Sequence, residues 1–98
     1  MVKVSFVCPV FNKQKYLKNV INSIKNQKGE FDKEFIFIND GSTDLSLQYL
    51  KKFTKKLKKV KIIDQSNRGP AVATQKGIES SSAALGRRII FGMSSSPV

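Results

Sequence analysis

The hydrophobic pattern of this chain changes its period in a regular way along the sequence. Short apolar runs rich in Val, Ile and Phe, typical of buried strands, alternate with stretches in which apolar residues recur every three or four positions, typical of amphipathic helices. The predicted strands are 2–8, 34–39, 60–64 and 88–91, and the predicted helices are 14–27, 45–57 and 70–80. Because the connections are too long for hairpins, this order predicts an α/β fold, a Rossmann-like parallel sheet with flanking helices in the order β-α-β-α-β-α-β.

Local signals mark the ends of several predicted elements. Pro9 should stop the first strand, because proline supplies no backbone N–H. The short side-chain oxygen of Asn12 can cap the first helix by accepting hydrogen bonds from its free N–H groups. Pro70 suits the first turn of the third helix, where that N–H would have no partner within the helix.

Composition excludes several classes of chemistry. The chain has 98 residues, enough for one domain, and it contains no His. It therefore cannot supply a Ser-His-Asp triad, a Cys-His dyad or a His-ligated metal site. The single cysteine, Cys8, excludes an internal disulfide and fits a reduced, cytoplasmic setting. No apolar run is long enough to predict a transmembrane segment.

The chain is strongly basic, with 18 Lys and Arg against 7 Asp and Glu and a net charge of +11. Seven of the lysines lie in the stretch 51–61, which contains no acid. Such a block can attract nucleic acid or a lipid surface. However, Leu50, Phe53 and Leu57 recur at helical spacing, which predicts one amphipathic helix with the lysines on its solvated face. No aromatic residue interleaves with those lysines on their own face of the predicted helix, so a basic nucleic-acid-binding domain is the less favoured alternative and no nucleic-acid partner is expected.

Ligands of parallel α/β sheets bind beyond the carboxyl ends of the strands. Three predicted loops lie at that edge, 9–13, 40–44 and 65–70. The first lacks the spaced glycines of a dinucleotide site, and the chain has no phosphate-binding P-loop. The first loop also lacks the carboxylate pair that a phospho-acceptor receiver domain would need. Function should therefore depend on the side chains of these three loops.

Each loop carries one candidate binding group and an alternative structural explanation. Asp40 ends a buried strand and can accept a hydrogen bond from a nucleobase or a sugar hydroxyl. Alternatively, Asp40 and Ser42 form an Asx-type turn that caps the next helix. Asp44 is expected to be structural, because an acid in the first turn faces the helix dipole favourably. Phe11 can stack on a base or fold onto the core.

The third loop offers an arginine and a glycine. Arg68 can reach a phosphate, and Gly69 permits a close approach of the backbone. The alternative is an ordinary helix entry with a solvated arginine.

Three segments together resemble the start of a family 2 glycosyltransferase: VSFVCPVFNK, FIFINDGSTD and NRGPAVATQKGI. These enzymes have the GT-A fold and use nucleotide-diphosphate sugars. The resemblance covers about residues 2–79 and is specific because the first two motifs occur in order, one βα unit apart. It implies that the nucleotide is bound by ten residues, namely Pro9, Val10, Phe11, Asn12, Asp40, Gly41, Ser42, Asn67, Arg68 and Gly69.

The resemblance also assigns roles to individual positions. The loop from Pro9 to Asn12 would lie against base and ribose, with Phe11 in place of the commoner Tyr. Asp40 matches the family acid that accepts a base N–H, usually from uracil. Asn39 stands where the family commonly has another Asp, and its side chain should point the other way.

The third segment departs from the family pattern. Thr74 and Gln75 occupy the positions of the usual Arg-Asn pair, and the nearby cations Arg68 and Lys76 are not at the matching positions. Contacts from this helix to the diphosphate or the sugar are therefore not expected by resemblance alone.

Complete relatives bind a divalent metal, Mg or Mn, through an Asp-x-Asp element after the fourth strand. Here the residues after 88–91 are Gly, Met and serines, so no metal ligands are assigned. No catalytic residue is assigned either, because the general base is expected beyond residue 98. We interpret 1–79 as the nucleotide-binding part of a glycosyltransferase 2-like domain and 80–98 as a divergent, truncated or altered tail.

We therefore expect a glycosyltransferase of hexosyltransferase type, or a fragment of one, that binds a nucleotide-diphosphate sugar. A UDP-sugar is the favoured ligand. Complete relatives would transfer the sugar with inversion to a hydroxyl of an acceptor saccharide or lipid, in the cytoplasm or at the inner face of the membrane. The chain alone is expected to be inactive. The alternative is a non-catalytic nucleotide-binding module or remnant.

Overall fold

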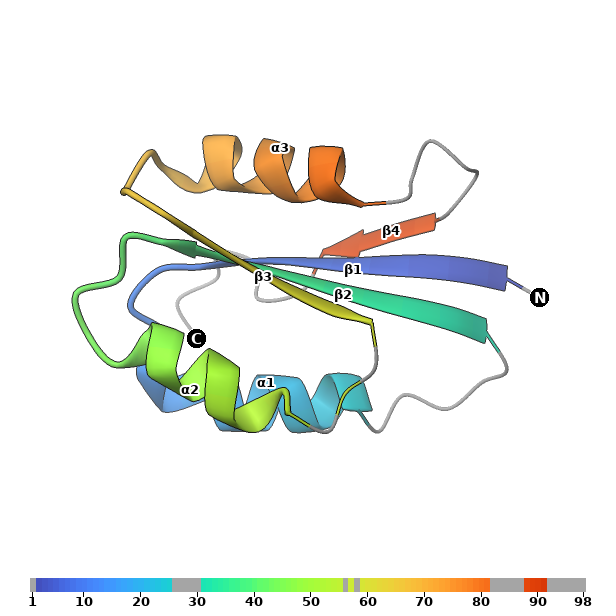
Figure 1. The fold of residues 1–98 in the computed structure, drawn as a ribbon, viewed down its shortest axis with the longest axis horizontal. Coiled ribbons are helices and arrows are strands. Elements are labelled where there is room, and N and C mark those ends of the chain that lie inside the picture. The colour runs from blue at the N-terminus through green and yellow to red at the C-terminus, as the bar shows by residue number, and fades with distance from the viewer. Residues whose placement is uncertain (1, 26–30, 56, 58, 82–87, 92–98) are drawn as a thin grey trace.

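The computed structural model of the chain describes residues 2–25, 31–55, 57, 59–81 and 88–91. Strands and helices alternate in the predicted order (Figure 1). They are β1 (Val2–Val10), α1 (Gln14–Lys25), β2 (Phe31–Asp40), α2 (Ser46–Phe53), β3 (Val60–Gln65), α3 (Pro70–Ser80) and β4 (Arg88–Phe91). The strands form one parallel, four-stranded sheet in the order β3-β2-β1-β4. The predicted α/β class and parallel sheet are confirmed.

Helices cover both faces of the sheet, with α1 and α2 on one face and α3 on the other (Figure 1). Alternate side chains of the central strands serve the two faces, as the pleat requires. Toward α1 and α2 lies the larger core cluster, which includes Val4, Phe6, Cys8, Val10, Leu17, Ile21, Phe35, Phe37 and Leu50. Toward α3 lies a smaller cluster of Val7, Ile36, Ile38 and Ala73.

The helix α3 packs against the sheet through small residues. Ala73 and Gly77 are its buried residues. A Cβ atom on Gly77 would collide with Cγ1 of Val7 and would lie 2.6 Å from Cδ1 of Ile38. This close contact sets the position of the amino end of α3 over the carboxyl ends of β1 and β2.

A small polar cluster lies on the α3 face near the opposite end of the strands. The hydroxyl of Ser5 donates to Oε2 of the buried Glu34 at 2.7 Å. Lys61 lies 3.7 Å from the other Glu34 oxygen and donates to the carbonyl of Ser80 at 2.8 Å. The cluster therefore joins β1, β2, β3 and the last residue of α3.

The first strand is longer than predicted. It continues through Pro9 to Val10, where these two residues lie in register with Ile38 and Asn39 of β2. Proline is tolerated here because it stands near the end of the strand, beyond the part of β1 that pairs with β4. The prediction that Pro9 stops the strand was wrong by two residues.

The second helix is shorter than predicted and ends at Phe53. Both the backbone N–H and the hydroxyl of Thr54 donate to the carbonyl of Leu50, at 3.1 and 2.6 Å. The N–H of Leu57 then donates to the carbonyl of Thr54, three residues back, so the helix does not reach Leu57. Leu57 still packs against the core from this turn.

The prediction that the lysines of the stretch 51–61 share one helix face was therefore wrong. Lys51 and Lys52 lie on α2, whereas Lys55 follows the helix and Lys61 lies on β3. Lys59 has a φ of +54° just before β3. Residues 56 and 58 lie outside the described part of the chain.

Candidate functional site

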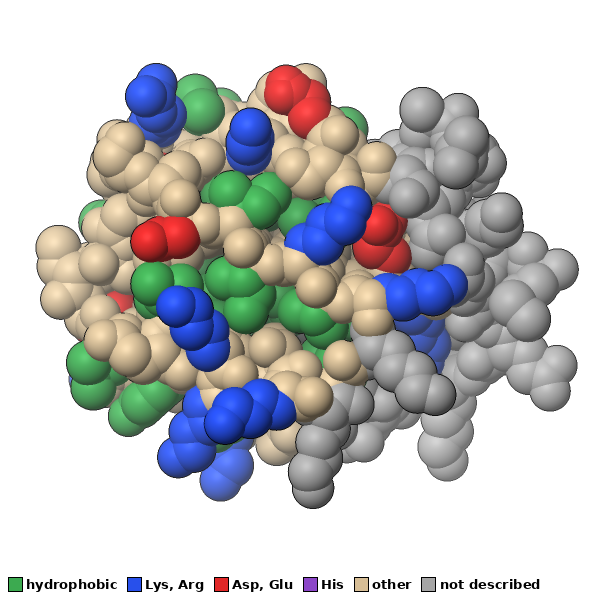
Figure 2. Space-filling model, viewed as in Figure 1, with side chains coloured by type: hydrophobic (Ala, Val, Ile, Leu, Met, Phe, Trp, Pro, Cys, Tyr) green, Lys and Arg blue, Asp and Glu red, His purple; other side chains and the backbone are tan. Residues whose placement is uncertain are grey.

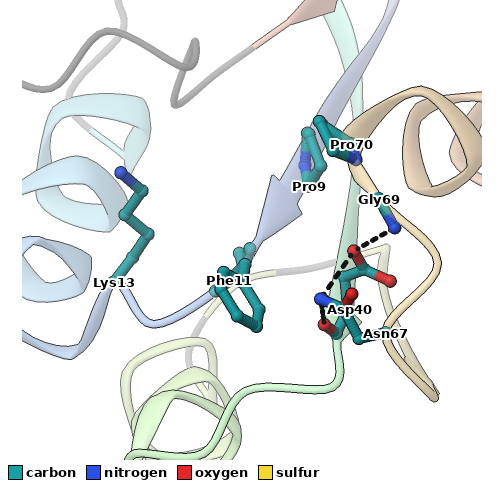
Figure 3. A pocket seen from close by; sticks show the side chains of 8 residues that line it. Pro9, Phe11, Lys13, Asp40, Asn67, Gly69 and Pro70 are labelled. Carbon is teal, nitrogen blue, oxygen red and sulfur yellow. Dashed lines mark hydrogen bonds between the residues drawn. The ribbon is translucent and has the colours of Figure 1, made fainter.

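The loops that follow β1, β2 and β3 meet at the carboxyl edge of the sheet and enclose a pocket of about 400 Å³ (Figure 3). Because the three strands are parallel neighbours, their ends lie at the same edge. The pocket is lined by Pro9, Val10, Phe11, Lys13, Asp40, Asn67, Gly69 and Pro70. It therefore occupies the place at which ligands of such sheets bind.

Asp40 is the last residue of β2 and is only 2 % exposed. Its Oδ1 accepts hydrogen bonds from Nε2 of Gln65 at 3.0 Å and from the backbone N–H of Arg68 at 2.8 Å. Its Oδ2 accepts the backbone N–H of Gly69 at 3.0 Å. The carboxylate thus holds the β3–α3 loop in place from the neighbouring strand.

These hydrogen bonds keep the Asp40 carboxyl group ionised. Burial raises the pKa of the group, but the hydrogen bonds from Gln65 and from the backbone of Arg68 and Gly69 outweigh it and hold the pKa below the usual 3.8. An ionised carboxylate is an acceptor only, with about four lone-pair positions. Asn67 Nδ2 lies 3.5 Å from Oδ2, at the limit of a hydrogen bond. Asn67 Nδ2 also donates to the backbone carbonyl of Asp40 at the shorter distance of 3.0 Å, so an N–H of a molecule in the pocket could replace its long contact with Oδ2.

Two glycines shape the loops around the pocket, Gly41 by permitting a close approach and Gly69 by its backbone conformation. Gly41 has a φ of +69°, and a Cβ atom there would lie 3.0 Å from Cα of Asn67 and nearer still to its backbone nitrogen. Gly69 has a φ of +95° and a ψ of 160°, a conformation that is essentially restricted to glycine. Its N–H points to Asp40 in this conformation.

Asn12 joins the first loop to the second. The prediction that it caps α1 was wrong. Its side-chain Oδ1 accepts the N–H of Thr43 at 2.8 Å, and its own N–H donates to Oγ of Ser42 at 3.1 Å. Asn12 has a φ of +50°, which asparagine tolerates better than most residues. The loop that carries Phe11 is therefore fixed by contacts across the site.

The caps of α1 come from the second loop instead. Asp44 Oδ2 accepts the N–H of Gln14 at 3.2 Å, and Ser46 Oγ accepts the N–H of Lys13 at 3.0 Å. Asp44 Oδ1 also accepts the N–H of Ser46 at 2.9 Å, at the start of α2. The structural role predicted for Asp44 is confirmed, and it extends to both helices.

Burial raises the pKa of Asp44, but the hydrogen bonds from the Ser46 hydroxyl and from the backbone of Ser46 and Gln14 lower it below 3.8. The alternative in which Asp40 and Ser42 cap α2 is not what the structure has. Asp40 binds the third loop, and the Ser42 hydroxyl donates to Oδ1 of Asn39 at 2.5 Å.

Asn39 and Asp40 point to opposite faces of β2, as predicted. Asn39 lies in register with Asp64 and donates to its Oδ1 at 2.9 Å, whereas Asp40 lies in register with Gln65. Asn39 therefore supports the β2–α2 loop through Ser42, and Asp40 supports the pocket. The two neighbouring residues have different tasks because the strand alternates its side chains.

The structure brings six of the ten predicted residues to the pocket wall: Pro9, Val10, Phe11, Asp40, Asn67 and Gly69. Asn12, Gly41 and Ser42 hold the loops together behind it. The Arg68 side chain instead lines a separate groove against the outer side of α3, together with Gln75 and Lys76. Sequence analysis missed Lys13 and Pro70, although each directly adjoins a predicted residue.

The described residues do not fit a divalent metal. Within ranges 2–25, 31–55, 57, 59–81 and 88–91, no group of three or more His, Cys, Asp or Glu side chains could hold one. Asp40 and Asp44 already accept hydrogen bonds from N–H and hydroxyl donors. The segment in which the Asp-x-Asp element was expected lies outside the described residues.

Across the described part of the chain, no helix is long and apolar enough to cross a membrane.

A parallel β3-β2-β1-β4 sheet covered by helices on both faces is the Rossmann-like arrangement of GT-A glycosyltransferases. The chain is similar to crystal structures of Staphylococcus aureus TarS, residues 1–349, in complex with UDP and with UDP-GlcNAc. Each aligns with a TM-score of 0.75, at 26 % and 27 % identity, over 92 % of this chain and 26 % of TarS 1–349.

Similar curated proteins are also named glycosyltransferases. An uncharacterised glycosyltransferase of Rickettsia bellii is 42 % identical over 91 % of this chain, and the putative glycosyltransferase EpsH of Bacillus subtilis is 35 % identical over 90 %. The matched region spans 12 % and 24 % of the length of these relatives. The family described as Glycosyl transferase family 2 matches residues 5–91. The chain therefore belongs to glycosyl transferase family 2, and the glycosyltransferase class that its motifs predicted is confirmed.

Proposed function

We propose that the pocket binds the nucleoside diphosphate of an activated sugar, with UDP as the preferred nucleotide. The observation that carries this proposal is the buried carboxylate of Asp40 in the pocket wall, which is held ionised and whose longest hydrogen bond, 3.5 Å from Asn67, a ligand N–H could replace. The aromatic side chain of Phe11 lies beside it in the pocket wall (Figure 3). A ring and an acceptor together are what a flat base with an N–H edge requires.

The protonation state of Asp40 favours some bases over others. Uracil presents an N3–H, which an ionised carboxylate accepts in a charge-assisted hydrogen bond. Cytosine presents an unprotonated N3 at the same place, so that its lone pair would face the carboxylate. Leaving such an acceptor unsatisfied costs about 1–3 kcal/mol. UDP should therefore bind at least about fivefold more tightly than CDP.

Phe11 supplies the stacking surface. It is 45 % exposed, which is high for a phenylalanine, and it lies between Lys13 on one side and Asp40 on the other (Figure 3). Stacking of a base on an aromatic side chain is worth about 1–3 kcal/mol. Lys13 adds a cation to the pocket wall that suits a diphosphate group.

The comparisons support this assignment of the ligand. Structures of TarS 1–349 with UDP and with UDP-GlcNAc align with nearly the whole chain. The curated Staphylococcus aureus TarS is named a poly(ribitol-phosphate) β-N-acetylglucosaminyltransferase and is 36 % identical over 71 % of this chain, which is 13 % of TarS. We infer by analogy that the chain contributes the donor-nucleotide part, residues 1–79, of an inverting transfer to an acceptor hydroxyl of a saccharide or lipid.

Transfer itself requires groups that the described residues do not supply. A general base must be a free carboxylate near the acceptor, whereas Asp40 and Asp44 are both engaged in hydrogen bonds. We propose that the base and the Mg or Mn ligands come from residues outside the described ranges. On this basis the described part of the chain binds nucleotide and does not by itself transfer sugar.

The proposal is tested by titrating the 98-residue chain with UDP, CDP and ADP by calorimetry or chemical-shift mapping. We expect UDP to bind with shifts at the pocket residues, and CDP to bind at least about fivefold more weakly. Phe11→Ala should reduce UDP affinity about fivefold or more. Val72→Ala is the matched control, because Val72 is 46 % exposed but lies on α3 outside this pocket. Equal affinity for UDP and CDP, or no binding of UDP, would reject the proposal.

A further inference from the structure

Lysines give the outward face of the α1–α2 layer a positive charge near the start of α1 and around the end of α2, whereas the uncharged Asn19, Asn22 and Ser23 are exposed farther along α1. Neither helix contains an Asp or a Glu. Exposed lysines lie on the side of each helix away from the core, with further lysines just before α1 and just after α2. We call this surface the basic helical face, and it comprises Lys13, Lys15, Lys18, Lys51, Lys52 and Lys55.

The acids near this layer do not neutralise it. Asp44 is held by the N–H groups of Gln14 and Ser46, and Asp40 is buried in the β3–α3 loop contact. Glu34 is buried on the α3 face, beside Lys61. Among the described residues, none of the six lysines of the basic helical face forms an ion pair. In Figure 2, blue side chains gather over α2, whereas blue and red side chains mix over α3.

Exposed apolar side chains border the same layer at one end. Of the four large apolar residues that are exposed in the described part of the chain, three lie there: Phe11, Tyr16 and Leu45. The N–H of Leu45 donates to Oε1 of Gln14 at 2.9 Å, which holds the first residues of the two helices together. Lys13 Nζ lies 5.9 Å from the centre of the Tyr16 ring. Lysine side chains and exposed apolar side chains therefore lie next to one another near the start of α1 and α2.

We propose that the basic helical face docks on an anionic phospholipid bilayer. The lysines would contact lipid phosphates, and Tyr16 and Leu45 would enter the boundary between headgroups and acyl chains. A surface of this kind gains from both attractions, whereas either one alone gives weak attachment. This proposal goes beyond nucleotide binding and does not depend on it.

A bilayer suits the surface better than a nucleic acid does. The basic helical face contains no arginine that could form a bidentate contact with a phosphate or a base edge. Tyr16 lies among the lysines of α1, but a single exposed ring forms no series of stacking platforms. Docking in this way would place Phe11 and Lys13, and with them the mouth of the pocket, at the level of the lipid headgroups.

The test is sedimentation of the 98-residue chain with vesicles. Vesicles of equal parts phosphatidylglycerol and phosphatidylcholine should bind the chain, and vesicles of phosphatidylcholine alone should not. Binding should weaken steeply between about 0.05 M and about 0.5 M salt, because the Debye length shortens. Lys15→Gln and Lys51→Gln should each reduce the affinity about fivefold, and the double variant should reduce it further.

Lys76→Gln is the matched control, because it removes the same charge from the exposed side of α3 on the opposite face of the sheet. It should leave vesicle affinity within about twofold. Equal losses for Lys76→Gln and Lys51→Gln would mean that net charge alone acts, which overturns the proposal. Failure to bind anionic vesicles at low salt also overturns it.

The apolar contribution is tested with Leu45→Ser. This variant should lose vesicle affinity while its salt-dependent binding to duplex DNA, if the chain shows any, stays unchanged. DNA or RNA binding tighter than vesicle binding, together with no effect of Leu45→Ser on vesicles, would assign the surface to nucleic acid and reject the bilayer. Leu45 is 47 % exposed, so the substitution opens no cavity in the core.

Discussion

Asp40 and Gln65 occupy the same register position on neighbouring strands, and Nε2 of Gln65 donates to Oδ1 of Asp40 at 3.0 Å. The same carboxylate accepts the N–H groups of Arg68 and Gly69 in the loop that follows. One side chain thereby fixes both the end of β3 and the start of α3. The residue proposed to recognise the base is also the residue that builds one wall of the pocket.

Replacing Asp40 by Asn should therefore lower stability as well as affinity. The amide has one acceptor oxygen instead of two, so one of the N–H groups of Arg68 and Gly69 would lose its partner. We expect the free energy of unfolding to fall by about 1–3 kcal/mol, the cost of a buried unsatisfied polar group. Urea denaturation measures the loss. Val72→Ala, an exposed change on α3, should change stability by less than about 0.5 kcal/mol, and an equal loss there would contradict the explanation.

Acid should destabilise the fold through Asp40 and Asp44. Both carboxyl groups have a pKa below 3.8 in the folded chain, because their hydrogen bonds outweigh the effect of burial. In the unfolded chain each pKa returns toward the ordinary value, so the unfolded state binds more protons in this range. The stabilising contribution is complete above about pH 5 and is lost as the pH falls through the folded pKa.

Thermal unfolding between pH 7 and pH 2.5 measures this dependence, with the melting temperature expected to fall steeply below about pH 4. Asp44→Asn removes one of the two groups, so this variant should start from a lower melting temperature and show a shallower fall. A melting temperature independent of pH across the acid range would contradict the assignment.

Most of the fold was predictable because hydrophobic periodicity reports the burial of each element directly. The ends of β1 and α2 were not predictable, because the local sequence signals there do not coincide with the ends of the elements. Pro9 usually ends a strand, but here the strand continues to Val10 in register with β2. The pattern of Leu50, Phe53 and Leu57 keeps helical spacing although the helix stops at Phe53, since Leu57 packs on the core from a turn.

The place of a residue in the pocket wall was predictable where a motif identifies both the loop and the residue, as for Phe11 and Asp40. It was not predictable where the partner lies on another loop. Asn12 has the residue type of a helix cap, yet it binds Thr43, about 30 residues away in the sequence. The caps of α1 come from Asp44 and Ser46. Local rules cannot choose between a local and a distant acceptor, because the choice depends on how the strands are aligned.

Gly77→Ala should destabilise the chain through overpacking. A Cβ atom at this position would collide with Val7 and Ile38, which belong to the middle of the sheet and cannot move away easily. Overpacking of this kind costs about 1–3 kcal/mol, and the gain in helix propensity of about 1 kcal/mol offsets only part of it. Gln75→Ala, on the exposed side of the same helix, should be neutral or slightly stabilising. A Gly77→Ala variant as stable as Gln75→Ala would show that α3 can move off the sheet.

Asn39 and Asp64 form a hydrogen-bonded pair. We expect the chain to tolerate an exchange of the two residue types better than the single substitution Asn39→Asp. Asn39 donates to Asp64 through Nδ2 and accepts from Ser42 through Oδ1. Asn39→Asp would place a second carboxylate at hydrogen-bonding distance from Asp64 and would remove the donor. Loss of the hydrogen bond and charge repulsion should together lower the free energy of unfolding by about 1–3 kcal/mol.

Asp64→Asn should cost less, because two amides can still form the hydrogen bond. In the double variant Asn39→Asp, Asp64→Asn, donor and acceptor have exchanged places, so most of the lost stability should return. A double-mutant cycle by urea denaturation measures the coupling, which we expect to exceed about 0.5 kcal/mol for residues in contact. Additive losses in the double variant would mean that Asn39 supports the β2–α2 loop through Ser42 alone.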